Sequence, residues 1–166
     1  MNQKVLLIGT VIFSFLILVG SYFLIFGGKP SSIKIVSYDL NDKKRPKAEL
    51  KNNFSDMGKI KVSSEKAAEF TIKNVGQKPL QLFNISSSCG CTVASVIIDG
   101  KESEEFGMHS QSNYVGEVVP GKQATIRVTY RPYVMPVYGP VEREVYVSTN
   151  NPEKEKLVFK VRAFVK

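Results

Sequence analysis

The sequence predicts an all-β protein, an immunoglobulin-like antiparallel β-sandwich of about seven strands preceded by one N-terminal transmembrane helix. Three observations favour this fold class. After residue 27, short segments alternate between apolar and polar side chains, as a strand with one buried face does. Turn-forming residues separate these segments, and none of them shows a convincing helical period. Several such strands over roughly 120 residues are typical of an immunoglobulin-type sandwich.

The segment from residue 5 to residue 26 carries no charge and is dominated by apolar side chains. At about 1.5 Å per residue, a helix of this length spans the roughly 30 Å hydrocarbon core of a bilayer. Neither an Ala-x-Ala-like cleavage site nor a lipoprotein cysteine comes after it. We therefore expect residues 1–28 to form an uncleaved signal-anchor helix, with a cleaved signal peptide as the alternative.

Two arguments give opposite orientations for this helix. Counted strictly, the basic residues close behind it, such as Lys29 and Lys34, would keep the downstream domain in the cytoplasm. The amino-terminal tail is short and contains Lys4, and a short tail before a first apolar helix usually leads to export of the downstream domain. We expect a single-pass protein of the inner (cytoplasmic) membrane, with its domain on the periplasmic or extracellular side.

Residues 29–46 are expected to form a linker, because they are polar and contain Gly and Pro. Within them only residues 33–38 alternate, which predicts a short strand. Residues 47–166 then form the sandwich domain. Its expected strands cover residues 48–54, 58–62, 66–75, 80–85, 93–98, 124–131, 141–149 and 157–165.

Turn residues indicate how the earlier strands connect. Gly58 and the polar residues before it predict a turn at residues 55–58. The turn at residues 74–79 predicts a β-hairpin between the strands on either side of it, and Asp99-Gly100 predicts a further turn. Residues 101–120 have no regular pattern and are expected to form an extended loop. A loop of that length in a compact domain is either functional or poorly ordered.

The last three strands alternate most clearly. Ala124, Ile126, Val128 and Tyr130 are separated by polar residues, and the same period recurs in 141–149 and 157–165. A Pro-rich connection over residues 132–140 and a turn at residues 150–152 separate these strands. Their partly basic outward faces predict antiparallel sheets with one solvent-exposed side.

The chain carries a net charge of +8, and its basic residues are spread along it, with the densest run at Lys43-Lys44-Arg45. Such a surplus can hold a domain near anionic lipid. Neither a basic helix nor an RNA-binding motif is visible. We therefore expect the membrane, contacted through the N-terminal helix, as one partner and no nucleic acid.

Cys89 and Cys91 are the only cysteines, and Gly90 separates them. Three interpretations stay open: a disulfide, a pair of metal ligands, or two small buried side chains in a bend. Across so short a loop, a disulfide adds at most about 1.6 kcal/mol of chain-entropy stabilisation. Such a bond would be easily reduced, as a redox-active dithiol requires.

A metal site would combine Cys89 and Cys91 with Met108 and His109 from the expected loop. Two thiolates, a thioether and an imidazole suit Cu(I) better than Zn(II). Structural zinc normally takes four ligands, and the chain has only this one imidazole. The alternative for His109 is an exposed loop residue. Apart from Cu(I), no cofactor is expected.

No catalytic constellation is recognisable. The chain lacks a glycine-rich phosphate loop, a paired-carboxylate signature and an HExxH motif. A Cys-His nucleophile would need His109 beside a thiol together with an orienting group, and no signature supports one. We therefore do not expect an enzyme.

Four motifs succeed one another along the chain. They are an Asn-x-Gly-x-x-Pro-Leu turn within residues 70–80, Ser-Cys-Gly-Cys-Thr at 88–92, a Pro-Gly turn at 120–122, and Thr149-Asn150. Their combination resembles the domain of unknown function 1573 family, a bacterial family of uncharacterised exported domains related to the Hydin-like immunoglobulin superfamily. The resemblance covers about residues 47–166. Residues 95–119 depart from it, because the family usually reaches its Pro-Gly turn sooner.

The resemblance implies an exported sandwich domain without an assigned activity, and the relatives of this family mostly act as adaptors or surface modules. Our leading hypothesis is a membrane-anchored, exported, non-catalytic immunoglobulin-like module that binds an envelope protein or has a structural role in the envelope. The alternative is a copper-binding or thiol-redox protein that uses Cys89 and Cys91.

Overall fold

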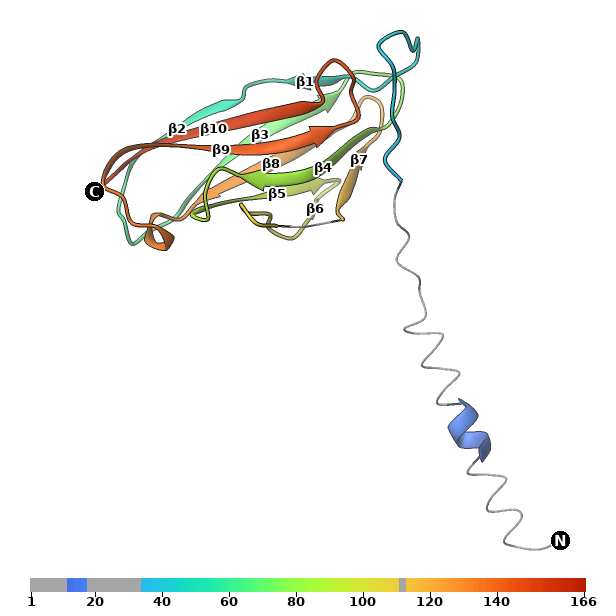
Figure 1. Ribbon diagram of the computed structural model, residues 1–166, viewed down its shortest axis with the longest axis horizontal. Helices are drawn as coiled ribbons and strands as arrows, with labels where there is room; N and C mark the ends of the chain where they lie inside the picture. Colours follow the sequence, from blue (N-terminus) through green and yellow to red (C-terminus); the bar gives the residue numbers. More distant parts are fainter. Residues whose placement is uncertain (1–11, 18–33, 111–112) are drawn as a thin grey trace, which may run out of the picture. The chain divides into compact units, whose positions relative to one another are not determined.

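The computed structural model describes residues 12–17, 34–110 and 113–166 (Figure 1). The chain divides into two compact units, Met1–Ile33 and Lys34–Lys166. In the first unit, residues 12–17 are helical, and the rest of the predicted signal-anchor helix lies outside the described residues. None of the helices formed by the described residues has the length and apolar character that crossing a membrane requires.

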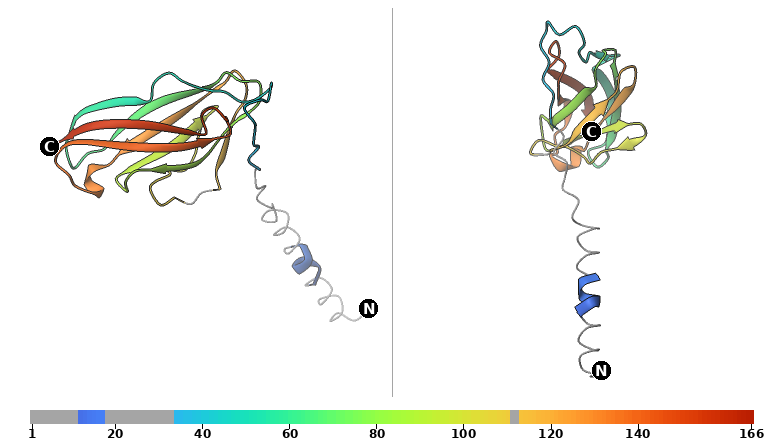
Figure 2. Two further views of the ribbon diagram at one scale, coloured as in Figure 1. Left: turned by 45° about the horizontal axis from the view of Figure 1, so that its top comes forward. Right: turned by 90° about the vertical axis from the view of Figure 1, so that its right-hand side faces the viewer.

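In the second unit, two five-stranded β-sheets pack face to face as a sandwich (Figures 1 and 2). In spatial order, the first sheet contains β1 (Ala48–Leu50), β3 (Lys66–Asn74), β8 (Gln123–Tyr130), β5 (Thr92–Ile98) and β6 (Lys101–Glu102). The second contains β2 (Phe54–Ile60), β10 (Lys156–Val165), β9 (Gly139–Thr149), β4 (Leu80–Ser87) and β7 (Val115–Val118). A short 3-10 helix, η1 (Pro132–Val134), lies between β8 and β9. The predicted all-β sandwich is confirmed.

Alternating side chains from both sheets fill the space between them. Every second residue of β8 and of β10 is buried, as the sequence pattern predicts. Phe70 of β3 and Phe159 of β10 meet between the sheets, with ring centroids 5.2 Å apart, and both are almost completely buried. Burial of this apolar surface, at about 25 cal/mol per Å², is the main stabilising contribution to the fold.

The predicted hairpin between residues 66–75 and 80–85 is wrong, because the two strands belong to different sheets. β3 pairs with β1 and β8, whereas β4 pairs with β7 and β9. Residues 75–79 therefore carry the chain from one sheet to the other. Alternation shows which face of a strand is buried, but it does not show which strand pairs with it.

Asn74 and Gly76 hold this crossing between the sheets. The Asn74 side chain is completely buried, and its Nδ2 group donates 2.8 Å hydrogen bonds to the carbonyl oxygens of Lys78 and Val118. Its Oδ1 atom accepts a hydrogen bond from Gly76 N at 3.0 Å. A Cβ at Gly76 would lie 2.4 Å from the carbonyl oxygen of Arg45, so only glycine leaves room for the segment that leads into β1. The Asn-x-Gly motif thus has a structural explanation.

Among the described residues there are ten strands, where about seven were expected. Part of the difference lies in residues 101–120, which were expected to form a loop. They contain β6, β7 and the buried Phe106, which forms an isolated bridge with Ala94. β6 has only 2 residues, too few for an alternating pattern to be visible.

The predicted turn at residues 55–58 is also wrong, because β2 runs through it without interruption. Gly58 has a φ of +69° inside the strand, and its N–H donates to Asp56 Oδ1 at 2.8 Å. This local irregularity uses the same residues as a turn, which explains the incorrect prediction. β2 pairs with β10 in parallel, and the other strand pairs of the described residues are antiparallel as predicted.

Residues 34–38 do not form the short strand predicted for 33–38, and Ile33 lies outside the described residues. The segment is attached to the sandwich by the buried side chain of Gln81 in β4. Gln81 Oε1 accepts a hydrogen bond from Val36 N at 2.8 Å, and Gln81 Nε2 donates to the carbonyl oxygen of Lys34 at 3.3 Å. A side-chain amide therefore takes the place of a strand partner.

Candidate functional site

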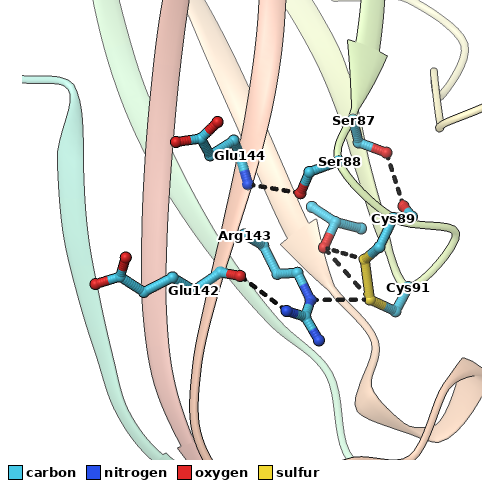
Figure 3. Close-up of a disulfide and its surroundings, with 8 residues drawn as sticks. Ser87, Ser88, Cys89, Cys91, Glu142, Arg143 and Glu144 are labelled. Atoms are coloured by element: carbon cyan, nitrogen blue, oxygen red, sulfur yellow. Dashed lines mark hydrogen bonds between the residues drawn. A yellow bond between two sulfur atoms is a disulfide. The ribbon is translucent and has the colours of Figure 1, made fainter.

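A disulfide joins Cys89 and Cys91 in the short turn between β4 and β5 (Figure 3). The sulfur atoms lie 2.02 Å apart and the Cα atoms 5.3 Å apart. Cys91 is only 1% exposed and belongs to the core, whereas Cys89 is partly exposed at its edge. Of the three interpretations that the sequence leaves open, the structure contains the disulfide, with one of its two sulfurs fully buried.

The disulfide turn is also held by contacts that do not involve sulfur. Ser88 N donates to the carbonyl oxygen of Glu144 at 2.9 Å, and Glu144 N donates to Ser88 Oγ at 2.9 Å (Figure 3). Thr92 N closes the turn on the carbonyl oxygen of Cys89 at 3.3 Å. The backbone of the turn therefore has supports on β9 that are independent of the disulfide.

Arg143 of β9 points at the disulfide (Figure 3). Its Nε group donates to Cys91 Sγ at 3.2 Å. Its guanidinium lies over the ring of the buried Tyr130, 5.6 Å from the centroid, which is a cation–π arrangement. The Thr92 hydroxyl oxygen lies 3.4 Å from Cys89 Sγ and 3.9 Å from Cys91 Sγ. The two sulfurs thus lie beside a positive charge and a hydroxyl group.

The sequence alone assigns no role to Arg143. The strand pattern places this residue on one face of the strand at 141–149, together with apolar residues. A charge on a face that packs against the core requires a polar or charged partner. This requirement could have identified Arg143 as a residue with a specific contact. Spacing alone could not show that the partner is Cys91, which lies on the turn between two other strands.

Met108 and His109, the other predicted metal ligands, lie in the connection between β6 and β7, and both are exposed. This connection lies against β5, because Phe106 and Ala94 exchange two backbone hydrogen bonds of 2.8 Å. Across residues 12–17, 34–110 and 113–166, no group of three or more His, Cys, Asp or Glu residues is arranged to hold a metal ion. The two cysteine sulfurs are bonded to each other, so Cu(I) binding stays a prediction for the reduced chain.

The connection between β8 and β9 contains an apolar stretch that lies next to the disulfide turn. Its large apolar side chains are 43–68% exposed and come from Tyr133, Val134, Met135, Val137 and Tyr138. We call residues 133–138 the apolar loop. Met135 Sδ lies 4.0 Å from the position of a Cβ at Gly90. The apolar loop and the disulfide turn therefore lie side by side, at the end of the sandwich that carries the C-terminus (Figures 1 and 2).

Ion pairs hold the base of the apolar loop. Arg131 Nε lies 2.9 Å from a carboxylate oxygen of Glu65, and Arg131 Nη2 lies 2.7 Å from one of Glu105. The Tyr133 hydroxyl donates to Glu65 at 3.2 Å. The hydrogen bond from Arg131, and then that from Tyr133, lowers the pKa of Glu65 below its ordinary value of 4.5. These contacts tie the loop to the β2–β3 turn and to the β6–β7 connection.

Removing the charge of Arg131 is expected to raise the pKa of Glu65 towards its ordinary value of 4.5. Because the pKa of Glu65 is lower in the folded state, its pairing with Arg131 stabilises the fold at pH values above the ordinary pKa. This stabilisation is lost as the pH falls through the folded-state pKa. An NMR titration of the Glu65 carboxyl in wild type and in Arg131→Gln measures the change. Arg162→Gln, which removes a separate ion pair with Asp56, is the control. An unchanged Glu65 titration in Arg131→Gln would show that the pair does not form in solution.

Several solved structures are similar to this chain. A protein of unknown function from Porphyromonas gingivalis W83 has a TM-score of 0.55 at 21% identity, and the match covers 73% of this chain and 47% of that one. A family 123 glycoside hydrolase from Clostridium perfringens, described for glycolipid glycan hydrolysis, has a TM-score of 0.51 at 11% identity. The match covers 68% of this chain and 22% of the hydrolase. PapD-like domain 7 of human CEP192 has a TM-score of 0.47 at 13% identity, and the match covers 83% of this chain and 98% of that domain. The chain thus spans less than half of the Porphyromonas protein, and the first two likenesses show the fold alone.

No curated protein matches the chain. The sequence does match a family model. A family model described as HYDIN/CFA65/VesB-like, Ig-like domain matches residues 46–163, which include all ten strands of the sandwich except the end of β10. The match confirms the immunoglobulin-like class predicted from the strand pattern. The chain therefore belongs to the HYDIN/CFA65/VesB-like, Ig-like domain family.

Proposed function

We propose that this chain is a membrane-anchored, exported and non-catalytic module that binds another protein of the cell envelope through its apolar loop. The uncharged apolar segment at residues 5–26 supports the anchor. The resemblance of its four motifs to an uncharacterised bacterial family of exported domains supports export, and we propose membership of that family as well.

The exposure of the apolar loop is the observation that carries the proposal. A soluble surface rarely gathers large apolar side chains in one place unless they contact something. Tyrosine and methionine are enriched where proteins bind one another, and the loop presents Tyr133, Met135 and Tyr138 within six residues. Tyrosine adds a hydroxyl that can bond at the rim of an interface, so a protein surface suits this loop better than lipid tails.

The base of the apolar loop is fixed before a partner arrives. Arg131 and Tyr133 bond to Glu65, and η1 shapes the first residues of the loop. Met135 lies beside the disulfide turn. Such contacts reduce the conformational entropy that the loop loses on binding, which favours affinity. We therefore expect the partner to contact the apolar loop and the adjoining disulfide turn together.

Replacing Tyr133, Met135 and Tyr138 by serine in the full chain tests the proposal. The wild type and the triple variant are each produced in the native host cells, and their envelope complexes are captured by chemical crosslinking. Loss of central aromatic contacts typically costs about 2 kcal/mol or more, equivalent to roughly thirtyfold weaker binding. The crosslinked protein adduct of the wild type should therefore be lost from the triple variant.

A matched control replaces exposed apolar residues elsewhere on the sandwich. Val75→Ser with Val119→Ser changes two side chains that are 41% and 48% exposed, and this variant should keep the adduct. An adduct that persists in the triple loop variant would contradict binding through the apolar loop. Crosslinks to lipid alone would contradict a protein partner.

A further inference from the structure

We propose that the Cys89–Cys91 disulfide is an exchangeable bond that oxidises a dithiol in a partner protein. Cys89 carries the sulfur that the partner's thiolate attacks, and Cys91 carries the leaving sulfur, which Arg143 stabilises. One disulfide is consumed for each partner dithiol oxidised, so the exchange is stoichiometric and agrees with a non-catalytic module. It goes beyond binding through the apolar loop and does not depend on it.

The two sulfurs differ in how easily another thiol can reach them. Cys91 is 1% exposed, so the backbone and core around it block an attacking sulfur. Cys89 is partly exposed, and the neighbouring Gly90 is exposed and has no side chain. A Cβ added at Gly90 would meet a single neighbour within 4 Å, Met135 Sδ at 4.0 Å. The space beside the turn is therefore open, and Cys89 is the reachable sulfur.

Arg143 gives Cys91 the properties of a leaving group. Its Nε group lies 3.2 Å from Cys91 Sγ, and its Nη1 group donates to the carbonyl oxygen of Glu142 at 2.8 Å. The ring of Tyr130 supports the guanidinium from one face. Burial disfavours a thiolate, but an adjacent arginine favours it. A stabilised thiolate leaves a disulfide faster, so the positive charge lies beside the sulfur that must carry the electron pair.

The exchange balances as two successive substitutions at sulfur. The first partner thiolate attacks Cys89 Sγ, a mixed disulfide forms, and the Cys89–Cys91 bond breaks with its electron pair moving to Cys91 Sγ. The second partner thiolate then attacks the partner's sulfur in the mixed disulfide and releases Cys89 as a thiolate, which takes up a proton. The partner is oxidised to a disulfide, and the chain is reduced to a dithiol.

Reduction leaves the surrounding structure in place. The hydrogen bonds between Ser88 and Glu144, and from Thr92 N to the Cys89 carbonyl, do not involve sulfur. A disulfide that closes so short a loop contributes little to the stability of the fold. The Thr92 hydroxyl lies within 3.9 Å of both sulfurs and can donate to either one as a thiolate. The turn can therefore pass between its oxidised and reduced forms without unfolding.

A redox titration with dithiothreitol tests the role of Arg143. The full chain, purified in detergent, is equilibrated with mixtures of reduced and oxidised dithiothreitol, and its thiols are counted by alkylation and mass spectrometry. We expect Arg143→Gln to lower the equilibrium constant for reduction about tenfold, which corresponds to about 30 mV. Arg143→Lys keeps the charge and should recover part of the loss, while Arg162→Gln should leave the constant unchanged. Equal constants in wild type and Arg143→Gln would overturn the proposal.

A second measurement uses the wild type alone and therefore does not depend on whether a variant folds. The oxidised chain is exposed briefly to glutathione and quenched with acid, and fragment-ion mass spectrometry locates the mixed disulfide. Glutathione on Cys89 is expected, and glutathione on Cys91 would contradict the assignment of the attacked sulfur. Both measurements use the purified chain with small thiols and no partner protein. Failure of the binding proposal is thus distinguishable from failure of this one.

Discussion

Replacing Phe159 by alanine is expected to lower the free energy of unfolding by about 3–5 kcal/mol. The ring is 0% exposed and packs against Phe70 of the opposite sheet, so its loss leaves a cavity between two rigid layers. Urea denaturation followed by far-UV circular dichroism measures the change.

Phe164 provides the matched control for this prediction, because it lies on the same strand, β10, with its side chain 47% exposed. Phe164→Ala should cost less than about 1 kcal/mol. Equal losses in the two variants would mean that the two faces of β10 are not buried as the sandwich requires.

Replacing Asn74 by alanine is expected to cost about 2–4 kcal/mol, because it removes the donor of two hydrogen bonds, a buried one to the Val118 carbonyl oxygen and a partly buried one to that of Lys78. The same change removes the acceptor of Gly76 N, which belongs to the crossing between the two sheets. Urea denaturation again measures the loss. Gln77→Ala, in the same connection but with an exposed side chain, should change the stability by no more than about 0.5 kcal/mol. Similar values for the two variants would contradict the role of Asn74 in the crossing.

The strands that alternate over a long stretch were the part of the fold that the sequence could predict. β8 and β10 each bury every second residue against one core, and the pattern is therefore visible without knowledge of their neighbours. The sequence could not show that β3 and β4 belong to different sheets. A turn motif looks the same whether the chain returns to the same sheet or crosses to the other. Asn74 and Gly76 decide between these outcomes through contacts with Val118 and Arg45, which are remote in the sequence.

The candidate site was predictable only in its cysteines. Cys89 and Cys91 are conspicuous as the only cysteines of the chain. Arg143, which donates a hydrogen bond to Cys91 Sγ, comes from β9, and in the sequence it is one basic residue among many. The sequence indicates the apolar loop only as a Pro-rich connection at residues 132–140. Residue type does not show whether an apolar side chain in this connection is buried or exposed: Pro132 is buried, whereas Tyr138 is 68% exposed.

Site-specific photo-crosslinking in intact cells tests the central claim, that the end of the sandwich formed by the apolar loop and the disulfide turn binds a protein. A photoreactive amino acid is placed at Tyr138, in the apolar loop, or at Val119, an exposed position on the β7–β8 connection. We predict a covalent adduct with an envelope protein from position 138 and none from position 119. The same adducts from both positions, or no protein adduct from position 138, would contradict the claim.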